Sequence, residues 1–296
     1  MRLVVFFSLT TGALVDWASG SLHASEMSLF RSLLPRLQTG ELLLGDRYYG
    51  VFAVLASVLE RKAHGLFRVA ASRLTDFRHG TRLGINDHLV TWTFPTVRPR
   101  GLTDEEYARL PRQMLLREIR ERVSIPGWRT RELVLVTTLL DSQEFPAEDL
   151  VQLYASRWLC EVRLRDLKIT LQMDVLRTLT PDMVRKELLA RLLAYNLIRT
   201  LMWTASRRFH TELQRLSFKG ALQHVRAFAP VFAGLPTSQI PIAYEHLLQT
   251  LAMENVPYRP HRFEPRLKKR RPKSYGWLQK PRTLCKRLLF LGRPLK

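Results

Sequence analysis

The sequence contains only two cysteines, Cys160 and Cys285, and they lie far apart. Two separated thiols cannot build a zinc cluster or a disulfide framework, so neither class of small cross-linked protein applies. The glycine spacings of Walker and dinucleotide-binding loops are absent, so no nucleotide cofactor is expected. The eight histidines show neither an HExxH motif nor another paired metal spacing, which excludes the zinc-protease pattern.

Long apolar runs are also lacking, so the sequence predicts no membrane span and no membrane partner. The N-terminal residues MRLVVFFSLTTGALVDWASG have the basic residue, apolar stretch and small residues of a secretory leader. However, Thr10, Thr11 and Gly12 interrupt the apolar stretch with a turn pattern, which favours a β-hairpin with strands at 2–8 and 13–18. A cytoplasmic protein with reduced thiols is expected.

Positive charge is abundant, because 47 Lys and Arg oppose 26 Asp and Glu to give a formal net charge of +21. Such a charge favours a polyanionic partner, with nucleic acid first and an anionic membrane second. The alternative is a basic protein without such a partner. With 46% hydrophobic residues, the chain can bury one large core or two smaller ones.

The periodicity of the apolar residues predicts the helices and strands. Residues 25–38 follow a helical rhythm up to Pro35, and 50–62 return to it. Between them, Leu42–Leu44 form a short apolar run typical of a strand buried on both faces, and Asp46 sits just past its carboxyl end. Residues 65–145 alternate short β-rich pieces with turns. Helices are expected over residues 146–172, from the Thr180–Pro181 cap to about 207, and over 211–227 and 240–253.

The tail differs in composition. Residues 259–296 carry fourteen Lys or Arg and one acid, Glu264, and prolines interrupt them. This pattern predicts an extended basic arm that contacts a polyanion, chiefly through Lys268, Lys269, Arg270 and Arg271. A solvated disordered tail is the alternative.

The predicted helix over residues 146–172 carries several candidate functional residues. Tyr154, Arg157, Glu161 and Lys168 fall within roughly a 60° arc of an ideal helix, and Arg165 extends that polar line. The adjacent apolar stripe comprises Leu153, Cys160, Leu164, Leu167 and Leu171. A carboxylate among cations is either a salt-bridge partner or a ligand for Mg²⁺ beside cations that bind phosphate.

The spacing Y-(2)-R-(3)-E-(6)-K within DLVQLYASRWLCEVRLRDLK resembles the signature of the IS-four-type bacterial DDE insertion-sequence transposases. LLLGDRYYG is similar to the segment around that family's second catalytic aspartate. LVLVTTLLDSQEFPAEDLVQLYASRW resembles the strand and loop before the signature helix, and RFEPRLKKRRPKSYGWLQKPR resembles the family's basic end.

The resemblance implies an α/β fold: a ribonuclease-H-like catalytic core with a mostly β insertion, followed by C-terminal helices and the basic tail. The implied domains are 1–64 and 146–258 for the core, 65–145 for the insertion and 259–296 for the tail. Asp46 and Glu161 would be metal-binding catalytic residues for Mg²⁺, with Mn²⁺ as the alternative ion. Tyr154, Arg157, Lys168 and Arg165 would bind transposon-end duplex DNA in a homodimeric synaptic complex.

One feature departs from the family. The first catalytic aspartate belongs on a strand before the hairpin, where the printed sequence begins, so an N-terminally truncated chain with little cleavage activity is expected. Asp16 is a poor substitute, because it is predicted on the outer hairpin strand. The alternatives are a non-catalytic DNA-binding transposase remnant and a basic RNA-associated protein. Trp92 and Trp128 are candidates either for insertion beside a flipped base or for packing the β-rich region.

Overall fold

The computed structural model describes residues 1–70, 73–99, 101–122, 132–257 and 281–291. The chain divides into two compact units. The first comprises residues 1–124 and 128–260, and the second comprises 125–127 and 261–296. The arrangement is mixed α/β, as expected, and a ribonuclease-H-like core remains a prediction.

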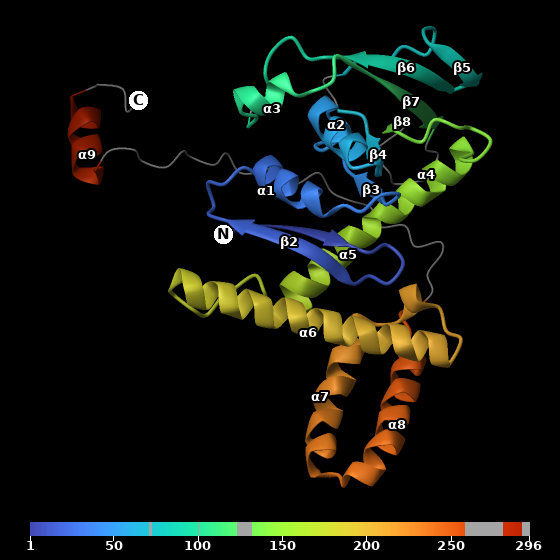
Figure 1. The fold of residues 1–296 in the computed structure, drawn as a ribbon. Coiled ribbons are helices and arrows are strands. Elements are labelled where there is room, and N and C mark those ends of the chain that lie inside the picture. Colours follow the sequence, from blue (N-terminus) through green and yellow to red (C-terminus); the bar gives the residue numbers. More distant parts are fainter. Residues whose placement is uncertain (71–72, 100, 123–131, 258–280, 292–296) are drawn as a thin grey trace. The chain divides into compact units, whose positions relative to one another are not determined.

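An N-terminal hairpin forms as the turn pattern predicts. β1 (Arg2–Phe7) pairs antiparallel with β2 (Leu14–Gly20). Helix α1 (Glu26–Leu33) follows, capped by the Ser25 side chain, which accepts from the backbone N–H of Ser28. A 3₁₀ turn containing Pro35 ends it, because proline cannot continue the α-helical hydrogen bonding. The hairpin lies between α1 and the long helix α6 (Pro181–Arg208) (Figure 1).

The larger sheet has six strands in the order β3-β4-β8-β7-β6-β5. β3 runs parallel to β4, with α2 as the connection, and the other neighbours are antiparallel. The ranges are β3 (Leu42–Gly45), α2 (Phe52–Glu60), β4 (His64–Arg68), β5 (Thr81–Gly84), β6 (Asp87–Thr93), α3 (Asp104–Ala108), β7 (Gln113–Arg122) and β8 (Glu132–Thr137).

The expectation that Leu42–Leu44 are buried on both faces is wrong. These leucines are half-buried, because β3 is an edge strand of this sheet with β4 as its described neighbour. The main core lies instead against α2, where Val54, Leu55 and Val58 are fully buried. Strands from the predicted core and from the predicted insertion thus share one sheet.

The prediction of one long helix over 146–172 is confirmed in part, because residues 147–170 are helical throughout but change helix type. The segment consists of α4 (Ala147–Ala155), a 3₁₀ turn (Ser156–Trp158), α5 (Leu159–Arg165) and a π-helical turn (Asp166–Thr170). A 3₁₀ turn has three residues and a π turn has more than an α turn. The faces of α4, α5 and the π turn are therefore rotated relative to the ideal phase.

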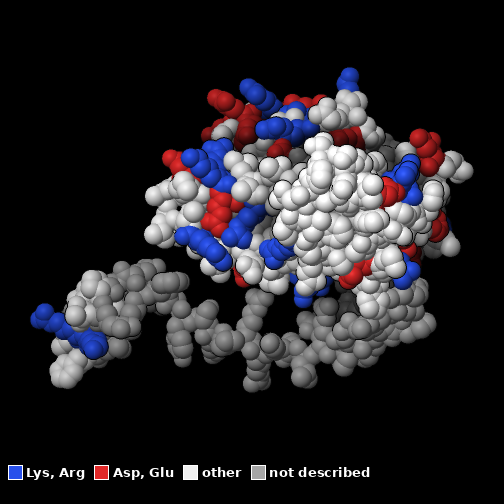
Figure 2. Space-filling view, turned by 90° about the horizontal axis from the view of Figure 1, so that it is seen from below, with Lys and Arg blue, Asp and Glu red and all other residues white. Residues whose placement is uncertain are grey.

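Two further helices form a hairpin on α6. α7 (Phe218–Gly234) and α8 (Ile240–Met253) pack against each other and against α6 through residues such as Leu222 and Leu248. Their connecting end extends away from α6 (Figure 1), and the surface there is uncharged (Figure 2). Among the residues that the structure describes, no helix is both long and apolar enough to cross a membrane.

The tail is not extended throughout, contrary to expectation. Residues Arg282–Phe290 form helix α9, which belongs to the second unit. Its apolar and basic residues alternate at helical spacing, a pattern that the compositional argument overlooked. The basic run Lys268, Lys269, Arg270 and Arg271 lies outside the described residues.

Candidate functional site

Asp46 follows β3 directly, as the sequence predicts, and its side chain is exposed. The backbone N–H of Tyr48 donates to Asp46 Oδ1 at 2.8 Å, which fixes the turn after the strand. The charge of Asp46 acts on both Tyr154 and Arg157, raising the pKa of each. The end of β3 and the start of the signature segment therefore lie within electrostatic reach of each other.

Arg157 pairs with Glu161, since its Nη2 donates to Glu161 Oε1 at 3.1 Å. The Glu161 side chain is 70% exposed. Burial lowers the pKa of Arg157, but the Glu161 hydrogen bond and the charges of Tyr154, Glu161 and Asp46 raise it, and the net direction is upward. Both carboxylates predicted as metal ligands therefore act on Arg157, Glu161 through an ion pair and Asp46 through its charge.

Tyr154 does not lie on the polar line. It is only 7% exposed and packs with Leu66, Ile119 and Leu150 under the sheet. Burial raises its pKa, while the charge of Arg157 opposes the rise. The Arg157 guanidinium still lies 6.0 Å from the ring centroid, so packing against the sheet, and not separation from the polar residues, removes Tyr154 from the surface.

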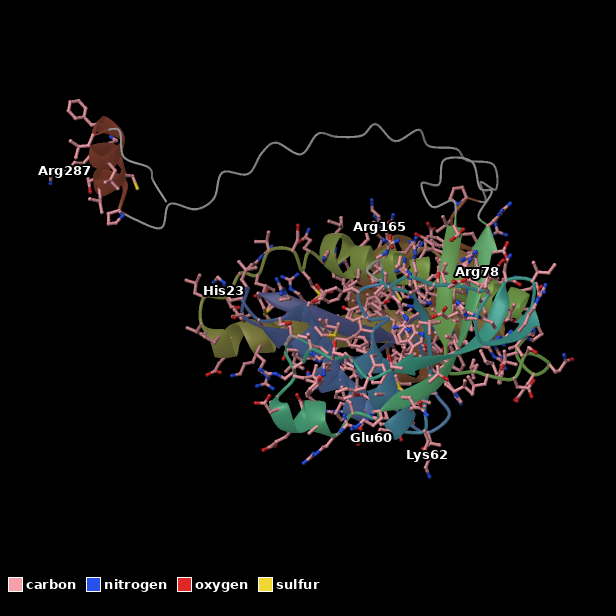
Figure 3. The ribbon with its side chains drawn as sticks, turned by 90° about the horizontal axis from the view of Figure 1, so that it is seen from above. His23, Glu60, Lys62, Arg78, Arg165 and Arg287 are labelled. Atoms are coloured by element: carbon pink, nitrogen blue, oxygen red, sulfur yellow. The ribbon has the colours of Figure 1, made fainter. Side chains whose placement is uncertain are left out.

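Arg165 and Lys168 are exposed, in agreement with the predicted polar face. Arg165 lies at the surface at the end of α5 (Figure 3). Lys168 lies in the π turn, whose Leu167 is buried, as the predicted apolar stripe requires.

Arg68 is a cation that the sequence analysis missed. β3 and β4 are parallel, with Gly45 opposite Phe67, so Arg68 follows at the end of β4 beside Asp46. Burial lowers the pKa of Arg68, as do the neighbouring charges of Arg47 and Arg157. The available signal was the parallel connection through α2, because the carboxyl ends of parallel strands meet at one edge.

Arg163 was missed as well. On an ideal helix it lies about 180° from Tyr154, beside the apolar stripe. It is 5% exposed, and its Nη1 and Nη2 donate to the carbonyls of Ser8 and Leu9, each at 2.8 Å. Gly12 of the same turn has a φ of 73°, and a Cβ there would collide with the Arg199 guanidinium. The hairpin turn thus holds the back of α5, whose front carries Glu161.

Asp16 lies on β2, opposite Phe6, as expected. Its Oδ1 accepts from the backbone N–H of Trp17, and its Oδ2 pairs with Arg36 at 3.5 Å. Among the described residues, no group of three His, Cys, Asp or Glu is placed to hold a metal ion.

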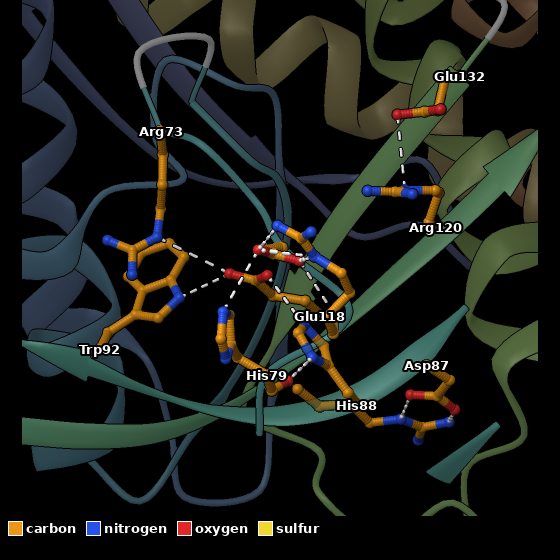
Figure 4. Close-up of polar contacts among 11 residues, drawn as sticks. Arg73, His79, Asp87, His88, Trp92, Glu118, Arg120 and Glu132 are labelled. Carbon is orange, nitrogen blue, oxygen red and sulfur yellow. Dashed lines mark hydrogen bonds and ion pairs between the residues drawn. The ribbon is translucent and has the colours of Figure 1, made fainter. Parts of the chain in front are cut away.

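Trp92 packs inside the β-rich region rather than at a surface. It is 1% exposed, and its Nε1 donates to Glu118 at 2.7 Å (Figure 4). The Arg73 guanidinium lies over the ring at 3.7 Å from its centroid. The packing interpretation therefore holds for Trp92. Trp128 lies outside the described residues.

An aspartate at a strand end, close to a helical segment with arginine and glutamate, is typical of sites where carboxylates bind metal ions and cations bind phosphate. The chain belongs to the transposase DDE domain family, whose profile matches residues 1–197. It is similar to the transposase InsG for insertion sequence element IS4 of Escherichia coli (strain K12), with 28% identity over 281 residues. The match covers 93% of this chain and 61% of that relative. The predicted membership of the IS-four-type transposases is confirmed.

Proposed function

We propose that this chain carries out metal-dependent DNA strand cleavage and transfer at the ends of an insertion sequence. The observation that carries the proposal is the convergence of Asp46 and Arg68, at the ends of β3 and β4, with Arg157 and Glu161 of the signature segment. Carboxylates for a metal ion and cations for phosphate oxygens are the groups that phosphoryl transfer needs.

DDE transposases as a family use a divalent metal ion. Asp46 and Glu161 fit such an ion, because both are exposed carboxylates and Mg²⁺ takes one or two carboxylates while keeping several waters. When bound, Mg²⁺, or Mn²⁺ in its place, polarises the attacking and leaving oxygens. Glu161 now shares an oxygen with Arg157, so ligation requires that this ion pair loosen.

The basic residues divide into two roles. Arg157, which pairs with Glu161, and Arg68, which lies within electrostatic reach of Arg157, are proposed to bind the phosphate at the reacting bond. Arg165 and Lys168 are exposed further along the same segment and are proposed to contact flanking phosphates of the transposon end. Tyr154, being buried, is proposed to set the position of Arg157, whose guanidinium lies 6.0 Å from its ring centroid. A homodimer would hold two ends together.

A non-catalytic DNA-binding protein is the second candidate, and the Arg157–Glu161 ion pair favours it, because an engaged carboxylate is not free for a metal ion.

We also propose weak cleavage by the 296-residue chain alone. Two metal ions need a bridging carboxylate in addition to Asp46 and Glu161, and loss of one electrostatic stabiliser lowers a rate by about 10²–10³.

The test uses a labelled duplex carrying the terminal repeat that flanks the coding region. Metal binding is measured separately, as loss of the free Mn²⁺ signal in electron paramagnetic resonance. Glu161→Gln and Asp46→Asn should weaken Mn²⁺ binding and retain end binding. Glu148→Gln, an exposed glutamate in α4, is the matched control and should change neither.

Three results would contradict parts of the proposal. Mn²⁺ binding that survives both substitutions would leave only DNA binding. Strong nicking that survives Glu161→Gln would remove the site assignment. Strong nicking that disappears in Asp16→Ala would identify Asp16 as a third metal ligand, despite its position on β2.

A further inference from the structure

β5 and β6 form the outermost hairpin of the six-stranded sheet (Figure 1). Their connection is a two-residue turn, Ile85 and Asn86, and Gly84 pairs with Asp87 across its base. We call residues 84–87 the β5–β6 tip. Ile85 is 84% exposed and Asn86 is exposed beside it, so an aliphatic and an amide side chain together form the end of this hairpin.

The β5–β6 tip lies at the same edge of the sheet as the candidate site. The strand register makes Asp87 of β6 level with three residues of the neighbouring strands, Ile119 of β7, Leu135 of β8 and Arg68 of β4. Asp46 follows β3 at that same level. The turn of the tip therefore extends one residue beyond the level of the candidate site, on the same side of the sheet's end.

The strand order gives the distance between the two. β3 and β6 are separated by four strand spacings, in the order β3-β4-β8-β7-β6, and neighbouring strands lie about 4.8 Å apart. The tip is thus about 19 Å from Asp46 along the edge. Successive base pairs of a duplex are about 3.4 Å apart. A duplex that lies along this edge with its reacting phosphate at Asp46 therefore brings the base pairs about five to six steps away to the tip.

The tip is held in place from both sides. Arg82 Nε donates to the carbonyl that begins the turn at 3.0 Å, and the backbone N–H of Arg120 donates to the carbonyl of Asn86 at 2.8 Å. At its base, Asp87 accepts from the fully buried Arg117 at 2.8 and 2.6 Å (Figure 4). A preformed tip loses little conformational entropy on binding, so it is suited to a specific contact.

The groups at the tip fit duplex DNA. Arg82 on β5 and Arg122 at the end of β7 are exposed beside it and can contact phosphates. Of the acids close to it, Asp87 is 8% exposed and already paired, and Glu132 pairs with Arg120 at 3.6 Å. Proteins that bind the minor groove read base edges with asparagine and insert isoleucine between base steps. An exposed isoleucine and asparagine between two arginines are such a set.

We propose that the β5–β6 tip inserts Ile85 between base steps of the end duplex, about five to six base pairs from the reacting phosphate, with Asn86 against the base edges. This inference rests on the proposed function, because it puts the reacting phosphate at Asp46. It adds a DNA contact remote from the reaction, in which Asp46 and Glu161 take no part.

The experiment replaces successive adenines of the end duplex by 2-aminopurine, whose fluorescence rises when its neighbouring base unstacks. Binding of the full 296-residue chain should raise the fluorescence most about five to six base pairs from the cleaved phosphate. Ile85→Ala should abolish this rise and weaken end binding about 10-fold. Ile85→Met keeps an apolar side chain that can enter a base step, so it should retain both.

Val97→Ala is the matched control. Val97 is 78% exposed and follows the carboxyl end of β6, so it lies at the opposite edge of the sheet from the tip. This variant should bind and unstack the end duplex as the wild type does. The urea midpoints of all three variants should equal that of the wild type, because both side chains are exposed.

A wild-type complex without unstacking would overturn the proposal, as would unstacking that Ile85→Ala retains or that Val97→Ala loses equally. Mn²⁺ binding by Asp46→Asn and Glu161→Gln separates this inference from the proposed function. If both variants keep Mn²⁺ while Ile85-dependent unstacking persists, the proposed function fails and the DNA contact of the tip stands. If Mn²⁺ binding needs both carboxylates and unstacking is absent, the contact of the tip fails alone.

Discussion

Arg163 and Arg165 lie two residues apart on α5, and we predict opposite effects from their substitution. Arg163 is buried and donates to the carbonyls of Ser8 and Leu9, whereas Arg165 is exposed. Arg163→Met should destabilise the chain and leave the DNA affinity of the folded fraction unchanged. Arg165→Met should leave stability unchanged and weaken binding of the end duplex.

The magnitude follows from the two hydrogen bonds. A hydrogen bond to a charged group contributes about 1.5–3 kcal/mol. Methionine recovers part of this by burying an apolar side chain of similar length, and water can reach the part-buried carbonyls. We therefore expect a loss of about 3 kcal/mol in the free energy of unfolding for Arg163→Met. Arg165→Met should change it by less than about 0.5 kcal/mol, as for other surface substitutions.

The assay is urea denaturation followed by circular dichroism, with end binding measured on the same preparations. With a slope of about 3 kcal/mol per molar urea, Arg163→Met should lower the midpoint by about 1 M. Arg163→Lys should lie between the wild type and Arg163→Met, because lysine can reach one carbonyl. Equal midpoints for Arg163→Met and Arg165→Met would refute the claim that the hairpin turn holds α5.

Three further predictions concern other parts of the chain. Asp87→Ala leaves the fully buried Arg117 without its carboxylate and should lower the free energy of unfolding, measured by urea denaturation, by about 3–5 kcal/mol. The control Asp76→Ala breaks an exposed ion pair and should leave the urea midpoint nearly unchanged. Burial raises the pKa of Asp166 from 3.8 to about 6, so the native state binds its proton more tightly, and stability decreases as pH rises through that window. Above pH 6, Asp166→Asn should therefore have a higher denaturation midpoint than the wild type. Below pH 3.8 the two midpoints should be equal. Deleting 259–296 should flatten the plot of log affinity against log salt by about 0.9 for each phosphate that the tail neutralises, and an unchanged slope would show that the tail does not bind phosphate.

The sequence predicted the elements well, because local patterns fix them. The Thr10–Gly12 turn, the strand before Asp46 and the cap at Thr180–Pro181 all depend on residues close in the chain. The alternation of β-rich pieces and turns likewise predicted strands within residues 65–145, where β5 to β8 lie. The family followed from one spacing pattern whose flanks also matched.

Tertiary structure decided how those elements face one another. An ideal 100° phase put Tyr154 on the polar face beside Glu161, but packing against Leu66 and Ile119 of the sheet buries the tyrosine. The spacing of residues along a helix cannot reveal which of them a sheet will cover, because that depends on contacts with residues far away in the chain. For that reason the sequence by itself determined the family, and it predicted Asp46 and Glu161 as candidate site residues. Only the assembled sheet placed Arg68 beside Asp46, and only the distant hairpin turn gave Arg163 its two carbonyl partners, since both depend on contacts between residues far apart in the chain.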